Sequence, residues 1–155
     1  LLVSSAASDV YKRQVENKLE EIFKSLIGIN KVKVNEIEIL QRKIKTVKSS
    51  KGVVWFDFKE ICDSPRSSLD FIEISKEFQT VIISNMFKIK SDDIARRFIS
   101  LIDECYDRKV KVIISAENNF KEIYEGSNLK EKFKRTISRL IEMQSVDYLK
   151  EAHKA

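Results

Sequence analysis

The fold is decided by residues 80–115, TVIISNMFKIKSDDIARRFISLIDECYDRKVKVIIS. Residues 80–84 and 110–115 are short and mostly apolar, as expected for strands that are covered on both faces. Between them, apolar residues recur at helical spacing from Ile94 to Cys105, and Ser91 precedes two acids at the start of that helix. A helix of this length returns the chain parallel, with a right-handed connection. The segment therefore predicts a parallel βαβ unit within an α/β fold.

Upstream of this unit, the apolar period changes from helical to alternating. Residues 16–28 place apolar side chains on one helix face and end in a glycine that suits a C-cap. Residues 32–39 and 43–48 alternate, which predicts an antiparallel hairpin that turns around Gln41-Arg42. Residues 53–58 (VVWFDF) predict a third, mostly buried strand that completes a small meander.

Capping residues and helical periods predict three further helices. Ser67 and Asp70 have the spacing of a capping box and open a helix that runs to about Phe78. Two more helices are expected over residues 119–125 and 129–144. The inward face of the helix that follows Ser67 is expected to hold Leu69, Ile72 and either Phe71 or Ile74.

The sequence lacks the loop that grips nucleotide phosphates. Its three glycines, Gly28, Gly52 and Gly126, are too far apart to share a loop, and no GxxxxGKS/T motif occurs. Residues 98–104 (FISLIDE) resemble a Walker B strand, but the helical period across them favours a helix. No apolar run approaches the roughly 20 residues that span a bilayer.

Cysteine and histidine usage argues against a zinc site. Cys62, Cys105 and the one histidine, His153, cannot supply four ligands. We expect two reduced, half-buried thiols in a cytosolic protein.

Residues 1–14 (LLVSSAASDVYKRQ) show neither a helical nor a strand period and do not have the layout of a signal peptide. They look like translated sequencing adapter, so we expect them to be non-native and disordered.

The helix over residues 129–144 carries the strongest anion-binding candidates. Arg135 and Arg139 are four residues apart and share one face, opposite an apolar stripe. A guanidinium here could reach a phosphate, which suits its planar fork. The alternative is surface salt bridging to Glu131 and Glu142, which flank the arginines.

Other polar positions give weaker signals. Arg96 and Arg97 are a second arginine pair, and Asp103 and Asp107 share a helix face without a third metal ligand. Strand ends of a parallel sheet are where ligands bind. The polar strand-end residues here are Ser84, Asn85, Ser115 and Glu117, which either contact a ligand or an adjoining domain, or cap the next segment. Trp55 is expected in the core rather than on a base-stacking surface.

Three blocks of the sequence resemble one family. WFDFKEICDSPRSSLDFIEIS (55–75), IARRFISLIDECYDRKVKVIISAE (94–117) and FKRTISRLIEMQSVDYL (133–149) are similar to the C-terminal part of the ZapE/Afg-type AAA+ ATPases. The resemblance covers about residues 16–151. It implies a P-loop NTPase fold divided into a helix plus hairpin (15–52) and the α/β C-terminal portion of the ATPase (53–152).

The resemblance also implies a function. Family members bind ATP and Mg²⁺ and hydrolyse ATP, but their phosphate loop and Walker B acids lie N-terminal to the matching region. The chain is thus expected to be an inactive C-terminal fragment that holds no cofactor and no catalytic residue by itself. Bacterial members are cytoplasmic and act in cell division with the FtsZ ring, which makes FtsZ or division-ring proteins the expected partners, and eukaryotic members are mitochondrial.

The same resemblance suggests roles for the arginines. If the RTISRLIEMQS block contributes to nucleotide sensing, Arg139 or Arg135 is the carrier, and Arg96 and Arg97 are the alternative. The oligomeric state of the parent stays open. A different class of function, a stand-alone nucleic-acid or protein-binding module with a basic arginine helix, is the alternative to the ATPase; the net charge of only +5 does not favour nucleic acid.

Overall fold

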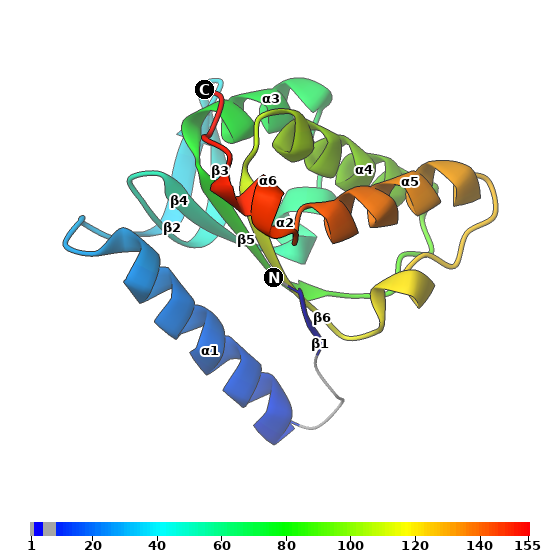
Figure 1. Cartoon of the computed structure of the whole chain (residues 1–155), viewed down its shortest axis with the longest axis horizontal. Helices are drawn as coiled ribbons and strands as arrows, with labels where there is room; N and C mark the ends of the chain where they lie inside the picture. Colours follow the sequence, from blue (N-terminus) through cyan, green and yellow to red (C-terminus); the bar gives the residue numbers. More distant parts are fainter. Residues whose placement is uncertain (1, 5–8) are drawn as a thin grey trace.

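The computed structural model describes residues 2–4 and 9–155, and within these it places six strands in one sheet (Figure 1). Four neighbouring strands are parallel, and an antiparallel hairpin extends the sheet beyond them. The predicted α/β fold with a meander and a parallel βαβ unit is therefore confirmed. Across the sheet, the order is β1 (Leu2–Ser4), β6 (Lys111–Ala116), β5 (Thr80–Met86), β4 (Val53–Asp57), β3 (Arg42–Ser50) and β2 (Lys33–Ile39).

The helices cover the two faces of the sheet unequally. One long helix lies across one face, and the remaining helices pack on the other (Figure 1). The long helix is α1 (Asp9–Ile27); the others are α2 (Phe58–Cys62), α3 (Ser68–Glu77), α4 (Asp92–Asp107), the 3₁₀ turn η1 (Phe120–Glu122), α5 (Lys130–Glu142) and α6 (Val146–Lys150).

Alternation along the buried strands separates two apolar clusters. In β4, Val54 and Phe56 face the larger cluster under α2–α6, whereas Val53 and Trp55 face α1. The ring of Trp55 lies 6.2 Å from that of Phe23 in α1. Because side chains point alternately to the two faces of a strand, a strand covered on both sides is apolar throughout. Trp55 is 1% exposed, which confirms its predicted place in the core.

The structure corrects three local predictions about element boundaries. The hairpin turns at Leu40 and Gln41, both with positive φ (51° and 63°), and Arg42 is already the first residue of β3. The predicted third strand ends one residue early, since Asp57 caps α2 by accepting from the backbone N–H of Lys59. The helix predicted over 119–125 is only the short η1, and α6 was not predicted.

The buried face of α3 differs from the predicted one. Both Phe71 and Ile74 are buried and Ile72 is half-buried, whereas Leu69, which was expected to face inward, is 62% exposed. Where the N-terminal segment is described, it also differs from the expected disorder. Leu2–Ser4 form β1 beside β6, and Asp9 begins α1; residues 1 and 5–8 lie outside the described residues. Among the described helices, none has the length and apolar character needed to cross a membrane.

Candidate functional site

Two of the four candidate arginines meet on one carboxylate. Arg139 of α5 donates to Asp103 of α4 through Nη1, and Arg135 Nη2 lies 3.9 Å from the other carboxylate oxygen of Asp103. The guanidinium of Arg139 also lies 4.9 Å from the ring centre of Tyr106, which is a cation–π distance. Residues four apart on α5 share a face, so both arginines reach across the α4–α5 contact. We call Asp103, Arg135 and Arg139 the arginine cluster.

The ion pairs expected within α5 do not form. Glu142 accepts from the hydroxyl of Tyr106, and Glu131 lies 3.5 Å from Lys134 instead of pairing with an arginine. The hydrogen bond to Glu142 raises the pKa of Tyr106 above its usual value. The carboxylate oxygens of Asp103 face two guanidinium groups, which does not favour the metal ligand role considered for Asp103 and Asp107. The described residues include no group of three or more potential metal ligands.

The other arginine pair lies apart from the cluster, in the first turns of α4. Arg96 Nη1 lies 3.1 Å from the carboxylate of Asp93, and both side chains are exposed. Arg97 donates to the carbonyl oxygen of Cys62 at 3.1 Å and so ties α4 to the end of α2. The structure thus brings Arg135 and Arg139 together and leaves Arg96 and Arg97 elsewhere.

At the carboxyl edge of the parallel strands, the polar side chains contact one another. Asn85, with φ of 62°, donates from Nδ2 to Asp57 at 2.9 Å, and its backbone N–H donates to the hydroxyl of Ser115 at 3.0 Å. Trp55 Nε1 donates to the hydroxyl of Ser84 at 2.9 Å. The hollow beside them under α1 measures about 10 Å³, close to the room that one water needs. Among the described residues, these hydrogen bonds tie β4, β5 and β6 together at this edge.

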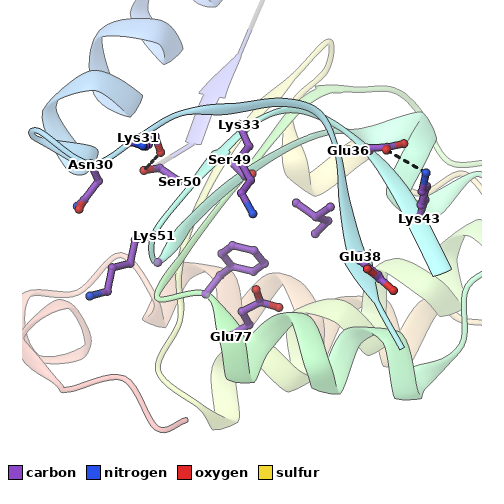
Figure 2. Close-up of a pocket in the computed structure, with 13 residues that line it drawn as sticks. Asn30, Lys31, Lys33, Glu36, Glu38, Lys43, Ser49, Ser50, Lys51 and Glu77 are labelled. Carbon is purple, nitrogen blue, oxygen red and sulfur yellow. Dashed lines mark hydrogen bonds and ion pairs between the residues drawn. The ribbon is translucent and has the colours of Figure 1, made fainter. Parts of the chain in front are cut away.

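A further cavity lies between the β2–β3 hairpin and the end of α3. It measures about 650 Å³, and Figure 2 shows side chains of both charges around it. Lys43 Nζ lies 3.4 Å from Glu36, while burial raises the pKa of Glu77 despite the nearby charge of Lys33. Because both lysines and glutamates line this cavity, the charges of its walls largely cancel and favour neither anions nor cations strongly.

Comparison with known proteins then decides the family. The profile of the AFG1-like ATPase family matches residues 4–152. The chain belongs to the AFG1-like ATPase family. Its resemblance to ZapE/Afg-type ATPases is thereby confirmed. It is 37% identical over 141 residues to the cell division protein ZapE of Escherichia coli K12. That match covers 89% of this chain and 37% of ZapE. It is also 38% identical over 92 residues, 58% of the chain, to an uncharacterized protein of Schizosaccharomyces pombe, of which it covers 20%.

This AFG1-like chain spans well under half the length of the relatives it matches.

The two thiols of the chain, Cys62 and Cys105, are free and fully buried rather than half-buried as expected. Burial raises the pKa of both, that of Cys105 to about 12, so neither is a reactive nucleophile at neutral pH.

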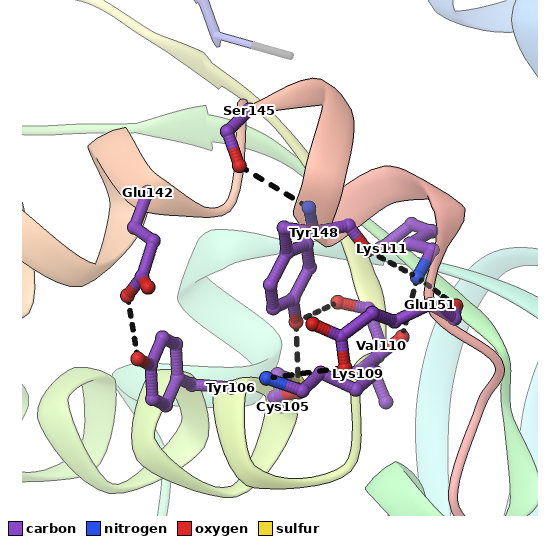
Figure 3. A network of polar contacts seen from close by, with 9 residues as sticks. All are labelled: Cys105, Tyr106, Lys109, Val110, Lys111, Glu142, Ser145, Tyr148 and Glu151. Carbon is purple, nitrogen blue, oxygen red and sulfur yellow. Dashed lines mark hydrogen bonds and ion pairs between the residues drawn. The ribbon is translucent and has the colours of Figure 1, made fainter.

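Sequence reasoning missed a polar network that fastens α6 to the sheet (Figure 3). The buried hydroxyl of Tyr148 lies 2.8 Å from the carbonyl oxygen of Val110 and 3.1 Å from that of Cys105. Lys111 Nζ donates to the carbonyl oxygens of Tyr148 and Glu151. Burial, the largest influence, raises the pKa of Tyr148 and lowers that of Lys111. The sequence signals that could have pointed to this helix are the Ser145 cap, which accepts from the backbone N–H of Tyr148, and the acid that follows it, Asp147.

Replacing Tyr148 by phenylalanine is expected to lower the free energy of unfolding by about 1–2 kcal/mol. The substitution keeps the ring but removes the hydroxyl that lies 2.8 Å from the buried carbonyl oxygen of Val110; the carbonyl oxygen of Cys105 still accepts from the backbone N–H of Val110 at 2.9 Å. Urea unfolding followed by circular dichroism measures the change. Tyr106→Phe is the matched control, with an expected change below about 0.5 kcal/mol, because the Tyr106 hydroxyl bonds an exposed carboxylate. Equal effects at the two positions would contradict the buried network.

Proposed function

We propose that this chain works as part of an ATPase that hydrolyses ATP with Mg²⁺ in bacterial cell division, in the cytoplasm. The match of residues 4–152 to the AFG1-like ATPase family and the identity to ZapE support this. Since the sequence has no GxxxxGKS/T motif, the chain alone is proposed to bind no nucleotide and to be inactive. FtsZ or other division-ring proteins are the proposed partners.

The arginine cluster is the proposed point of contact with nucleotide. Two guanidinium groups share the one carboxylate of Asp103, so the cluster keeps a surplus positive charge. Arg135 is 61% exposed and 3.9 Å from its partner, which leaves it free to turn toward a phosphate at small cost. Arg97 is a weaker candidate, because it already donates to the Cys62 carbonyl. This sharing of Asp103 is the observation that carries the proposal.

The ATPase proposal predicts a contrast between two polypeptides. The purified chain is expected to release no phosphate from Mg²⁺-ATP above the rate of the buffer. A reading frame extended upstream to include a GxxxxGKS/T motif is expected to turn ATP over. A malachite-green phosphate assay measures both. Turnover by the chain alone, or an upstream frame of several hundred residues without that motif, would refute the proposal.

Within that longer, active polypeptide, alanine substitutions test the arginine cluster. Arg135→Ala and Arg139→Ala are each expected to lower kcat/KM for ATP by at least about tenfold, since phosphate-contacting arginines contribute strongly to phosphoryl transfer. Arg96→Ala, at an exposed position away from the cluster, is the matched control and is expected to stay within about twofold. If Arg96→Ala gives the larger loss, the sensing role moves to the first turns of α4.

A further inference from the structure

A groove lies between η1 and α5. It consists of two hollows of about 310 and 470 Å³, which share Lys121 and Ile137 in their walls. Ile141 is 57% exposed at one end. The apolar lining of the groove consists of Phe120, Tyr124, Phe133, Ile137, Leu140 and Ile141.

The charged residues that line this groove are all of one sign. Lys121, Lys130 and Lys134 line it, and no aspartate or glutamate does so among the described residues. Lys134 lies 3.5 Å from Glu131, but both side chains are more than three quarters exposed, so this ion pair is weak and Lys134 can exchange it for another carboxylate at small cost. The groove therefore combines an apolar floor with a positive rim, unlike the mixed cavity at the β2–β3 hairpin.

We propose that this η1–α5 groove binds an acidic peptide segment of a partner protein, whose apolar side chains enter the two hollows. Apolar anchors supply most of the affinity in such grooves, and charge complementarity adds orientation and rate. Exposed Ile141 and half-buried Ile137 contact the anchors, while the three lysines face the carboxylates. The groove lies beside the arginine cluster but shares no residue with it, so the proposal does not depend on nucleotide sensing.

A random 16-residue peptide display library, panned on the purified chain, tests this chemistry directly. Enriched peptides are expected to combine an excess of Asp and Glu with at least two large apolar residues. Fluorescence anisotropy then gives their affinity, which is expected to fall as salt screens the lysine rim. Ile141→Asp and the double variant Lys121→Glu/Lys134→Glu are each expected to weaken binding by at least about tenfold.

Matched controls carry the same changes at exposed positions outside the groove. Leu69→Asp on α3 and Lys18→Glu on α1 are expected to keep the affinity within about twofold. Enrichment of basic peptides, no enriched class, or binding that survives Ile141→Asp would overturn the proposal. It would also be overturned if sedimentation shows a dimer that Ile141→Asp abolishes, since a second copy would then occupy the groove.

Discussion

Replacing Phe98 by alanine is expected to lower the free energy of unfolding by about 3–5 kcal/mol, the largest effect that we predict for a single side chain. Phe98 is completely buried in α4. Its ring centre lies 5.9 Å from that of Phe58 in α2 and 6.0 Å from that of Phe133 in α5. Removing the ring would leave a cavity where three helices meet. Urea unfolding followed by the fluorescence of Trp55, the one tryptophan, measures the loss.

The control variants separate a cavity from a general loss of apolar surface. Phe98→Leu fills most of the space and is expected to cost about 1 kcal/mol, and it keeps the test open if the alanine variant does not fold. Leu69→Ala removes a side chain that is 62% exposed, and we expect a change below about 0.5 kcal/mol. A Phe98→Ala variant as stable as Leu69→Ala would show that α2, α4 and α5 do not pack as described.

Features set by local spacing were predictable from the sequence. The apolar face from Ile94 to Cys105 and its Ser91 cap identified α4, and Ser67 with Asp70 identified the start of α3. The alternation of apolar residues did not show where the hairpin turns. The turn lies at Leu40 and Gln41, which adopt positive φ values that side chains other than glycine rarely take, so neither residue marks a turn in the sequence. The strand predicted over 53–58 ends at Asp57, one residue earlier than expected. The side chain of Asp57 caps α2, so Phe58 begins that helix instead of continuing the strand.

The candidate site was predictable only in part. Spacing placed Arg135 and Arg139 on one face of a helix, and the structure agrees. Their partner could not be found the same way, because Asp103 lies on another helix and meets them through the packing of α5 on α4. Glu131 and Glu142 were nearer in sequence but bond other groups. Contacts within one helix follow from sequence spacing, whereas contacts between helices depend on their packing.

The buried carboxylate of Asp70 leads to the second large effect. Its side chain is fully buried, yet it pairs with Arg42 at the start of β3 and accepts from the backbone N–H of Ser67 at 2.9 Å. Asp70→Ala is expected to lower the free energy of unfolding by about 3 kcal/mol, because it strips the capping box of α3 and leaves Arg42 unpaired. The side chain of Arg42 is 51% exposed, so water can solvate it after Asp70 is removed. The expected loss of unfolding free energy is therefore at the lower end of the range for breaking a buried ion pair.

Acidification is expected to reproduce part of this loss. Burial alone would raise the pKa of Asp70, but the hydrogen bonds from Arg42 and Ser67 together with the charge of Arg42 lower it below the usual value. The stabilisation from ionised Asp70 is then complete above the usual aspartate pKa of about 3.9 and disappears as the pH falls through the lowered folded value. Between these values the unfolded chain binds more protons, so stability rises with pH.

Urea titrations between about pH 2.5 and 5 measure this slope. The Asp70→Asn variant, which cannot ionise, is expected to show a shallower dependence than the parent chain. Asp93→Asn is the matched control: its exposed pair with Arg96 contributes little, so both the stability and the slope should stay close to those of the parent. If Asp70→Asn keeps the parent slope, other carboxylates govern acid unfolding, and the Arg42–Asp70 contact does not anchor the hairpin to α3.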